Sequence, residues 1–124
     1  MKIKESAENY LETILMIKNK KGNVRSIDIA NELNFTKPSV SVAMKHFREE
    51  GYIIMKEDGS ISLTDKGLKI AESVYERHRV IAKALMILGV DEDIAHEDSC
   101  KIEHDLSQET FDKIKEFYLN NIKE

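Results

Sequence analysis

The chain has 124 residues, of which 41% are hydrophobic and 34% are charged, so it can bury the core of one compact domain or two small ones and is not a disordered chain. No apolar run approaches the roughly 20 residues of a membrane span, and the start MKIKESAENY has no apolar signal segment, so we expect a cytoplasmic protein without a membrane partner. The single cysteine, Cys100, excludes an internal disulfide.

The net charge of −4 is unevenly distributed along the chain. Residues 1–70 hold 12 Lys and Arg residues against 10 Asp and Glu residues, whereas residues 71–124 hold 7 against 13. A mildly basic first part and an acidic second part are typical of segments with different partners, a polyanion for the first and cations for the second. An uneven solvated surface would show the same pattern, so charge alone leaves both interpretations open.

Two helices are predicted before residue 35. The segment 7–20 places apolar side chains at helical spacing, which indicates an amphipathic helix. A short second helix follows, for which Ser26 is the expected N-cap, and it ends near Asn34.

A third helix and a β-hairpin are predicted next. The helix begins after the cap Thr36, tolerates Pro38 in its first turn and stops at Gly51. The following stretch YIIMKEDGSISLT changes to two short β-prone runs around Asp58-Gly59, which is a strong hairpin signal. The apolar face of the third helix consists of Val40, Ala43, Met44 and Phe47.

Three further helices are predicted in the rest of the chain. The longest begins at Thr64 and continues to about Leu88, the fifth covers 92–105, and the sixth follows the N-cap Ser107. The apolar sides of the fourth and sixth helices exceed what a small helical domain buries easily, so we expect a helical dimer interface there, although the same residues could equally form an intramolecular core. These residues are Ile81, Leu85, Leu88, Phe111 and Tyr118.

The order of the first elements defines the expected fold class. Helix, short helix, tight turn, helix and β-hairpin is the order of a winged helix-turn-helix, which presents the second helix of the pair to the DNA major groove. We therefore predict a mainly α protein. Residues 1–70 form a winged helix-turn-helix DNA-binding domain of three helices and a hairpin wing, and residues 71–124 form a second, helical domain.

Candidate DNA contacts lie on the polar side of the third helix and on the wing. Lysines there would contact phosphate and supply salt-dependent affinity, while small polar side chains would read bases. Val42 lies among polar residues and could meet a thymine methyl group. Each position taken alone is equally typical of an ordinary protein surface. The predicted DNA-binding residues are Thr36, Lys37, Pro38, Ser39, Ser41, Val42, Lys45 and Lys56.

The stretch HEDSCKIEHDLS carries four metal-capable side chains. On a continuous helix they stand at i, i+4, i+7 and i+8, so they project from nearly the same side. Thiolate, imidazole and carboxylate donors together suit Fe(II), Co, Ni or Zn, and the carboxylates leave Mn open. The four residues are His96, Cys100, Glu103 and His104.

One helix cannot close a coordination sphere, so other elements must contribute ligands. The candidates are His78, which interrupts the apolar stripe of the fourth helix, and Asn9 with Glu12, which share the polar flank of the first helix. Each also has a structural interpretation. A histidine on an apolar stripe is often a hydrogen-bonded core residue, and Asn or Glu on a polar helix face is often only solvated.

Several stretches of the sequence together resemble a known family. SAENYLETI, the winged-helix pattern, YERHRVIAKALMILGV and above all HEDSCKIEHDLS are similar to the diphtheria toxin repressor and manganese transport regulator family of metal-dependent transcription factors, nearly end to end. The resemblance implies a helical metal-binding and dimerisation domain after the winged helix, and a homodimer on palindromic double-stranded DNA operators. It also implies Fe(II) or Mn(II) as the cofactor, with repression of metal-uptake genes as the usual outcome.

The resemblance also assigns metal ligands. It implies a primary site at Asn9, Cys100, Glu103 and His104 and a second site at His78 and His96.

The sequence mixes two patterns of that family. Iron-responsive members typically have Met in place of Asn9 and Glu in place of Ala82, whereas manganese-responsive members have Asp in place of Asn9 and Glu in place of Cys100. Cys100 and His96 resemble the iron pattern, whereas Glu12 and His78 resemble the manganese pattern. The sequence therefore leaves the metal and the number of ions open.

Two further departures concern DNA and length. Iron-type members often have Gln where Val42 stands, so the operator sequence is not implied. The chain ends at Glu124, where larger members continue into an SH3-like domain, so it resembles the short form.

The expected mechanism is geometric. Two recognition helices can bind successive half-sites only when they lie about one DNA turn, roughly 34 Å, apart. We expect metal that bridges the first helix to the fourth and fifth helices to select this spacing. The alternative is a winged-helix regulator that does not respond to metal. An enzyme is not expected, since the chain has neither HExxH nor a Gly-rich phosphate loop, and no organic substrate is implied.

Overall fold

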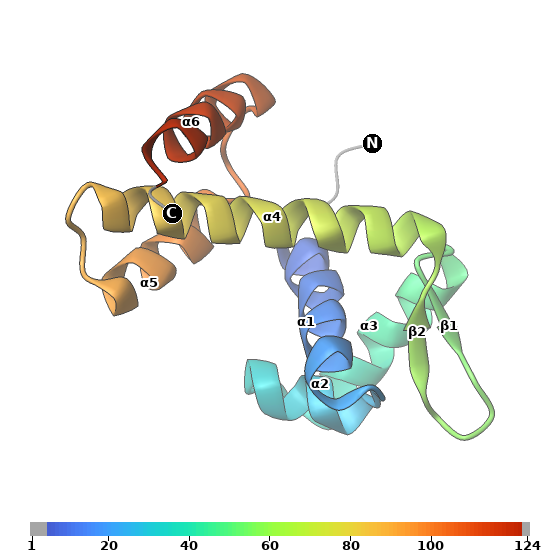
Figure 1. Cartoon of the computed structure of the whole chain (residues 1–124). Coiled ribbons are helices and arrows are strands. Elements are labelled where there is room, and N and C mark those ends of the chain that lie inside the picture. The colour runs from blue at the N-terminus through green and yellow to red at the C-terminus, as the bar shows by residue number, and fades with distance from the viewer. Residues whose placement is uncertain (1–4, 123–124) are drawn as a thin grey trace. The chain divides into compact units, whose positions relative to one another are not determined.

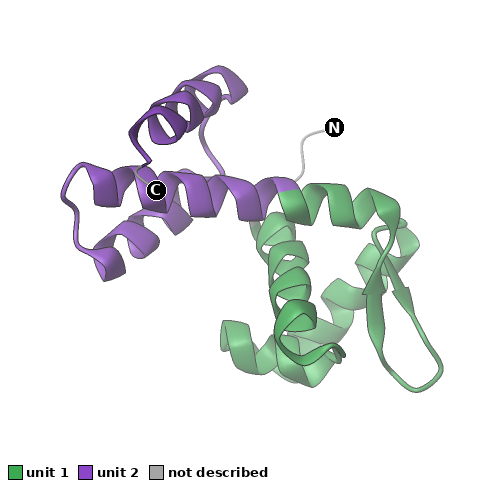
Figure 2. Ribbon diagram, viewed as in Figure 1, with its two compact units in different colours: residues 1–72 green, residues 73–124 purple. Residues whose placement is uncertain are grey.

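The computed structural model describes residues 5–122 of the chain. Their elements are α1 (Glu5–Lys21), α2 (Ser26–Leu33), α3 (Lys37–Glu49), β1 (Ile53–Met55), β2 (Ile61–Leu63), α4 (Asp65–Ile87), α5 (Glu92–Ile102) and α6 (Gln108–Asn121) (Figure 1). The chain forms two compact units, residues 1–72 and 73–124, and α4 begins in the first and continues in the second (Figure 2). The predicted order of helices and hairpin is confirmed.

The first unit is a three-helix core with a hairpin. Its α1, α2 and α3 bury apolar side chains at helical spacing, because each helix presents one apolar stripe to the others. The α3 stripe is buried at Val40, Met44 and Phe47, as its spacing predicts. Tyr10 of α1 packs edge-on against the Phe47 ring at a centroid distance of 5.5 Å. Side chains that are fully enclosed here include Leu11, Ile14, Val24, Ile29, Val40 and Met44.

The hairpin is antiparallel and pairs Ile53 with Leu63 and Met55 with Ile61. Its chain turns at Gly59, whose φ of +86° is a left-handed conformation that glycine adopts without steric cost. Gly67, in the first turns of α4, is required for a steric reason. A Cβ there would lie 2.1 Å from the carbonyl oxygen of Tyr52, so only glycine allows α4 to begin so close to the hairpin.

The second unit places α5 and α6 on different sides of α4 (Figure 1). Its core is built from Val80 and Ile81 of α4 and Phe111 of α6, which are 3%, 2% and 3% exposed. On the other side, the small residues Ala95 and Ser99 let α5 approach α4 closely, and the Ser99 hydroxyl donates to the carbonyl of His78 at 2.7 Å.

The residues predicted at a dimer interface divide between core and surface. Ile81 and Phe111 are buried within the unit, and Leu85 and Tyr118 pack against them. Leu88 is 69% exposed. An apolar groove crosses this face between α4 and α6, and its lining includes Leu85, Leu88, Ile114 and Phe117.

Two predicted helix boundaries are wrong. The N-cap of α2 is Arg25 and not Ser26, because the Asp28 carboxylate reaches back to accept the backbone N–H of Arg25 at 2.9 Å. The fifth helix ends at Ile102 and not at 105, because the chain turns over Glu103, His104 and Asp105 to reach α6. In the described part of the chain no helix is both long and apolar enough to cross a membrane.

Candidate functional site

Helix α3 has a capped N-terminus, one buried face and one exposed face. Thr36 caps it, with its hydroxyl oxygen accepting the backbone N–H of Ser39 at 3.3 Å, and Pro38 stands in the first turn. Opposite the buried stripe the helix exposes its predicted DNA contacts, and Val42 is 71% exposed. Most of the Val42 surface is therefore accessible to an apolar group on a partner. The exposed members on α3 and its cap are Thr36, Lys37, Pro38, Ser39, Ser41, Val42 and Lys45.

The wing is held in shape by polar contacts at its tip. The Asp58 carboxylate accepts the backbone N–H and the hydroxyl of Ser60 at 2.9 and 2.7 Å, and these hydrogen bonds hold the pKa of Asp58 below its ordinary value. The Arg25 guanidinium donates to the carbonyl of Asp58 and ties the tip to the loop before α2. Lys56, the predicted phosphate contact, is exposed beside this tip.

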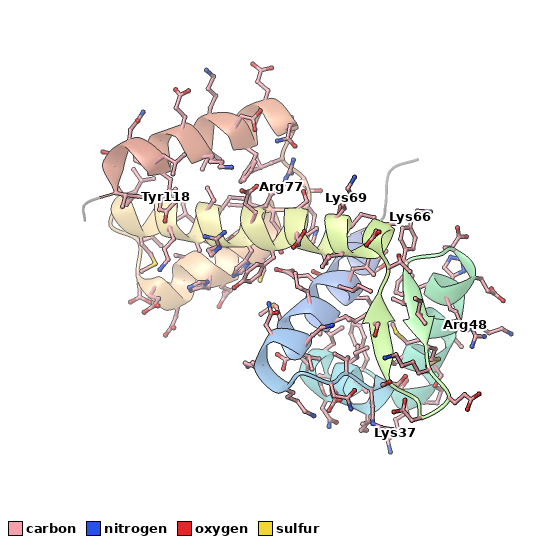
Figure 3. The ribbon with its side chains drawn as sticks, turned by 45° about the vertical axis from the view of Figure 1, so that its right-hand side comes forward. Lys37, Arg48, Lys66, Lys69, Arg77 and Tyr118 are labelled. Atoms are coloured by element: carbon pink, nitrogen blue, oxygen red, sulfur yellow. The ribbon has the colours of Figure 1, made fainter. Side chains whose placement is uncertain are left out.

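Arg25 and Arg48 are cationic positions that the sequence patterns did not single out. Arg48 is exposed on α3, three residues after Lys45, so helical spacing could have indicated it (Figure 3). No sequence signal identified Arg25, because its partner Asp58 lies 33 residues away.

Three metal-capable side chains converge in the second unit. Nδ1 of His78, Sγ of Cys100 and a carboxylate oxygen of Glu103 all lie within 4.8 Å of one another. Nδ1 of His78 is 3.1 Å from Oε2 of Glu103 and 3.7 Å from Sγ of Cys100. Bonds of 2.0–2.3 Å to a tetrahedral ion would separate such donors by roughly 3.3–3.7 Å, which is close to these distances.

His78 also contacts a second histidine. Its Nε2 lies 3.1 Å from Nδ1 of His96, and the two rings stack with centroids 5.2 Å apart. The two ring nitrogens of His78 therefore face different partners, Glu103 at Nδ1 and His96 at Nε2. His78 is therefore the centre of the network that joins α4 to α5.

The Glu103 carboxylate is an unusual group for a protein interior. Glu103 is 2% exposed, and among the described residues its Oε1 has no hydrogen-bond donor. Nε2 of His104 lies 3.4 Å from this oxygen, at ion-pair distance but outside hydrogen-bond geometry. A buried anionic oxygen without a donor is costly. A cation would relieve that cost, so the donor set fits a divalent metal ion.

The predicted ligands divide between the two units. The structure brings together His78, His96, Cys100, Glu103 and His104 in the second unit, but not on one helical stripe, because α5 ends before Glu103. Asn9 and Glu12 lie on α1 of the first unit, where Glu12 is 7% exposed. Ala82, where the family resemblance raised the question of a missing carboxylate, is buried and offers no donor atom.

A winged helix-turn-helix followed by a helical unit with a His–Cys–Glu cluster defines a class of DNA-binding regulator with a metal-capable centre. Comparison with known sequences agrees. The sequence profile of the iron dependent repressor N-terminal DNA binding domain matches residues 2–61, and that of the iron dependent repressor metal binding and dimerisation domain matches residues 64–123. The chain belongs to this family of metal-dependent, DNA-binding transcriptional regulators.

Individual relatives are similar over most of the chain. The transcriptional regulator MntR of Salmonella typhimurium is 33% identical over 92% of this chain and 73% of its own length. An uncharacterised HTH-type transcriptional regulator of Methanocaldococcus jannaschii is 35% identical over 91% of this chain and 92% of its own.

Solved structures share the fold. The manganese regulator SloR superposes with a TM-score of 0.79 at 29% identity over 94% of this chain, and IdeR of T. acidophilum with a TM-score of 0.78 at 26% identity over 94%. The chain spans only 54% of each of these two structures.

Proposed function

We propose that this protein is a transcriptional regulator that binds operator DNA when it holds Fe(II) or Mn(II), and that it represses genes for metal uptake. The observation that carries the proposal is the convergence of His78, Cys100 and Glu103 in the second unit of a winged-helix protein. The family profiles support both halves of the proposal, since one is a DNA-binding domain and the other a metal-binding and dimerisation domain.

The first three ligands of the proposed metal centre are His78, Cys100 and Glu103. Imidazole, thiolate and carboxylate donors suit Fe(II), with Co, Ni or Zn as surrogates, and Mn(II) would draw mainly on the carboxylate oxygen. Metals of this kind occur in relatives, since SloR is described as a manganese regulator and one structure of ScaR holds Zn²⁺. In this chain the bound ion would compensate the charge of the buried Glu103 carboxylate.

The remaining predicted ligands would complete the coordination. His96 and His104 contact His78 and Glu103 in the same unit. Asn9 and Glu12 stay predictions drawn from the sequence. In the mechanism expected from the sequence, the ion binds the DNA-competent arrangement more tightly than the alternatives, because equal affinity for all arrangements would shift no population.

The proposed DNA contacts are α3 in the major groove and the wing on the backbone. Val42, Ser39 and Ser41 would face base edges, and Lys37, Lys45 and Lys56 would contact phosphate. We propose a homodimer on a palindromic operator, because a two-fold dimer presents two recognition helices to two half-sites. The apolar groove at Leu85, Leu88 and Phe117 is a suitable surface for the second copy.

A titration of DNA binding tests the proposal. Fluorescence anisotropy would follow the purified protein against a pool of promoter DNA at fixed salt, first with chelator and then with Fe(II) under anaerobic conditions, Mn(II), Co(II) or Zn(II). We expect tight DNA binding only with metal. In His78→Ala we expect added metal no longer to increase the affinity for DNA. Equal binding with and without metal would instead support a winged-helix regulator that does not sense metal.

A further inference from the structure

Arg77 is the residue immediately before His78 on α4, and it holds the segment that follows α5 (Figure 3). Its Nη1 donates to the carbonyl oxygens of Glu103 and Leu106 at 3.1 and 2.7 Å. Its Nη2 donates to Oε1 of Gln108 at 3.2 Å. One guanidinium therefore spans the whole turn from the end of α5 to the start of α6.

One of these acceptors lies at the end of a helix. Glu103 is the C-cap of α5, and carbonyls at a helix C-terminus have no partner within the helix and carry the negative end of its dipole. A guanidinium offers a rigid fork of donors, so one Arg77 side chain can satisfy carbonyls on both sides of the turn. Its planar group also lies over the Phe111 ring, at 5.2 Å from the ring centroid, which fixes it against the core of the unit.

Two successive residues of α4 thus hold the two ends of Glu103. Arg77 binds its backbone carbonyl, and His78 contacts its carboxylate. With the backbone of Glu103 held, its side chain has few ways to turn away from His78 and Cys100. The same turn carries His104, whose side chain is buried beside the carboxylate.

We infer that Arg77 is a positioning residue for the metal centre. It binds no ion itself, but it fixes the turn that delivers Glu103 and His104 to His78. The inference rests on the proposed function, since it assigns Arg77 to the proposed metal site. Positioning groups outside the ligand set typically change metal affinity by 10- to 100-fold.

The test is a Co(II) titration of the full chain, read by visible absorption, whose band intensity and position report the coordination geometry. We expect Arg77→Gln to weaken Co(II) binding about tenfold and to alter the visible bands. We expect Arg77→Lys to show the same defect, because an ammonium group keeps the charge but cannot span both carbonyls and Gln108. Circular dichroism would verify that each variant is folded.

A matched control is Lys115→Gln. Lys115 donates to Glu76 at 2.9 Å, so this variant also breaks a link between α4 and α6, but it leaves the turn after α5 intact. We expect it to bind Co(II) like the wild type. The inference would be overturned if both Arg77 variants kept the wild-type spectra and Co(II) affinity. It would also be overturned if Lys115→Gln lost as much Co(II) affinity as Arg77→Gln, or if Arg77→Lys kept the full wild-type affinity. If the wild type itself bound no Co(II), the proposed metal function would fail together with the inference.

Discussion

Nδ1 of His78 lies 3.1 Å from Oε2 of Glu103, although the two residues are 25 positions apart in the chain. The contact joins α4 to the end of α5 and leaves the other carboxylate oxygen, Oε1, without a hydrogen-bond donor among the described residues. A buried carboxylate oxygen without a donor is costly unless a cation compensates it. In the proposed metal centre, an ion bound at this pair would therefore stabilise the second unit.

Replacing Glu103 by Gln should separate the effect of this carboxylate on metal affinity from its effect on stability. We expect metal affinity to fall by about 100-fold or more, because a charged carboxylate ligand becomes a neutral amide, and even groups outside the ligand set change affinity by 10- to 100-fold. Without metal, we expect the free energy of unfolding to rise by about 1 kcal/mol, because an anionic oxygen without a donor becomes neutral. Thermal unfolding with chelator and with excess Mn(II) measures both. Glu97→Gln is the control, since the Glu97 side chain is 73% exposed on α5. A metal-free Glu103→Gln protein less stable than wild type would contradict the argument.

Cys100 should determine how the protein ranks metals. Thiolate is a soft ligand, so we expect Cys100→Ser to lose more affinity for Zn(II) and Co(II) than for Mn(II). The near-ultraviolet absorption of a Co(II)–thiolate bond should disappear, while the metal-free melting temperature stays within about 1 °C because Cys100 is exposed. A Co(II) complex of Cys100→Ser that retained this absorption would remove Cys100 from the ligand set.

Lys45 should contribute to DNA affinity without reading sequence. It is exposed on α3, beyond the buried stripe. We expect Lys45→Ala to weaken binding equally to specific and unrelated DNA and to reduce the slope of log affinity against log salt by about one per protomer, or about two for the proposed dimer. Anisotropy titrations over a range of salt concentrations measure the slope. Lys101→Ala on α5 is the control, and an unchanged slope in Lys45→Ala would exclude a phosphate contact.

Asp28 should make the first unit sensitive to acid. A hydrogen bond from Lys21 at 2.6 Å, assisted by the backbone N–H of Arg25, lowers the pKa of Asp28 below its ordinary value of 3.8. A depressed carboxyl pKa stabilises the folded state above the ordinary value, and this stabilisation is lost as pH falls through the folded pKa.

At pH 7 we expect Asp28→Asn to lower the free energy of unfolding by about 0.5 kcal/mol, the value of a partly exposed pair. The difference from wild type should vanish as the pH falls through the lowered pKa of Asp28. Denaturant unfolding at several pH values measures it, with the exposed Glu49→Gln as control. A difference that did not depend on pH would show that the ion pair is not the cause.

Gly67 should tolerate no side chain. Alanine normally stabilises a helix relative to glycine by 0.5–1 kcal/mol. At this position its Cβ would lie 2.1 Å from the carbonyl oxygen of Tyr52, so we expect Gly67→Ala to destabilise the protein by about 2 kcal/mol instead. Chemical denaturation checks the sign. Ser73→Ala, at an exposed position of the same helix, should be neutral or slightly stabilising.

Much of the fold is predictable because its signals are local. Thr36 caps α3 as predicted, and Asp58-Gly59 forms the hairpin turn, because a side-chain cap and a left-handed glycine act over three or four residues. One prediction failed although its cause is also local. Ser26 is a good N-cap by type, but Asp28, held by Lys21, caps α2 from inside the helix.

The candidate site was predictable only as a set of residues. HEDSCKIEHDLS indicated donors on a continuous helix, but α5 ends at Ile102, where Arg77 holds the carbonyl of Glu103. The sequence contains no signal for this contact, because Arg77 and Glu103 are 26 residues apart. Their roles in metal binding stay predictions, and the Co(II) titrations described above address them.

Helical period, capping and turn chemistry act between near neighbours, so the elements, their order and the presence of metal-capable donors can be predicted from the amino-acid sequence. Which donors meet depends on how the helices pack. Small residues such as Ser99 bring α5 against α4 and so place His78 beside Cys100 and Glu103. Contacts of this kind depend on the packing of whole helices, and no local pattern of residues encodes the distance between two helix surfaces.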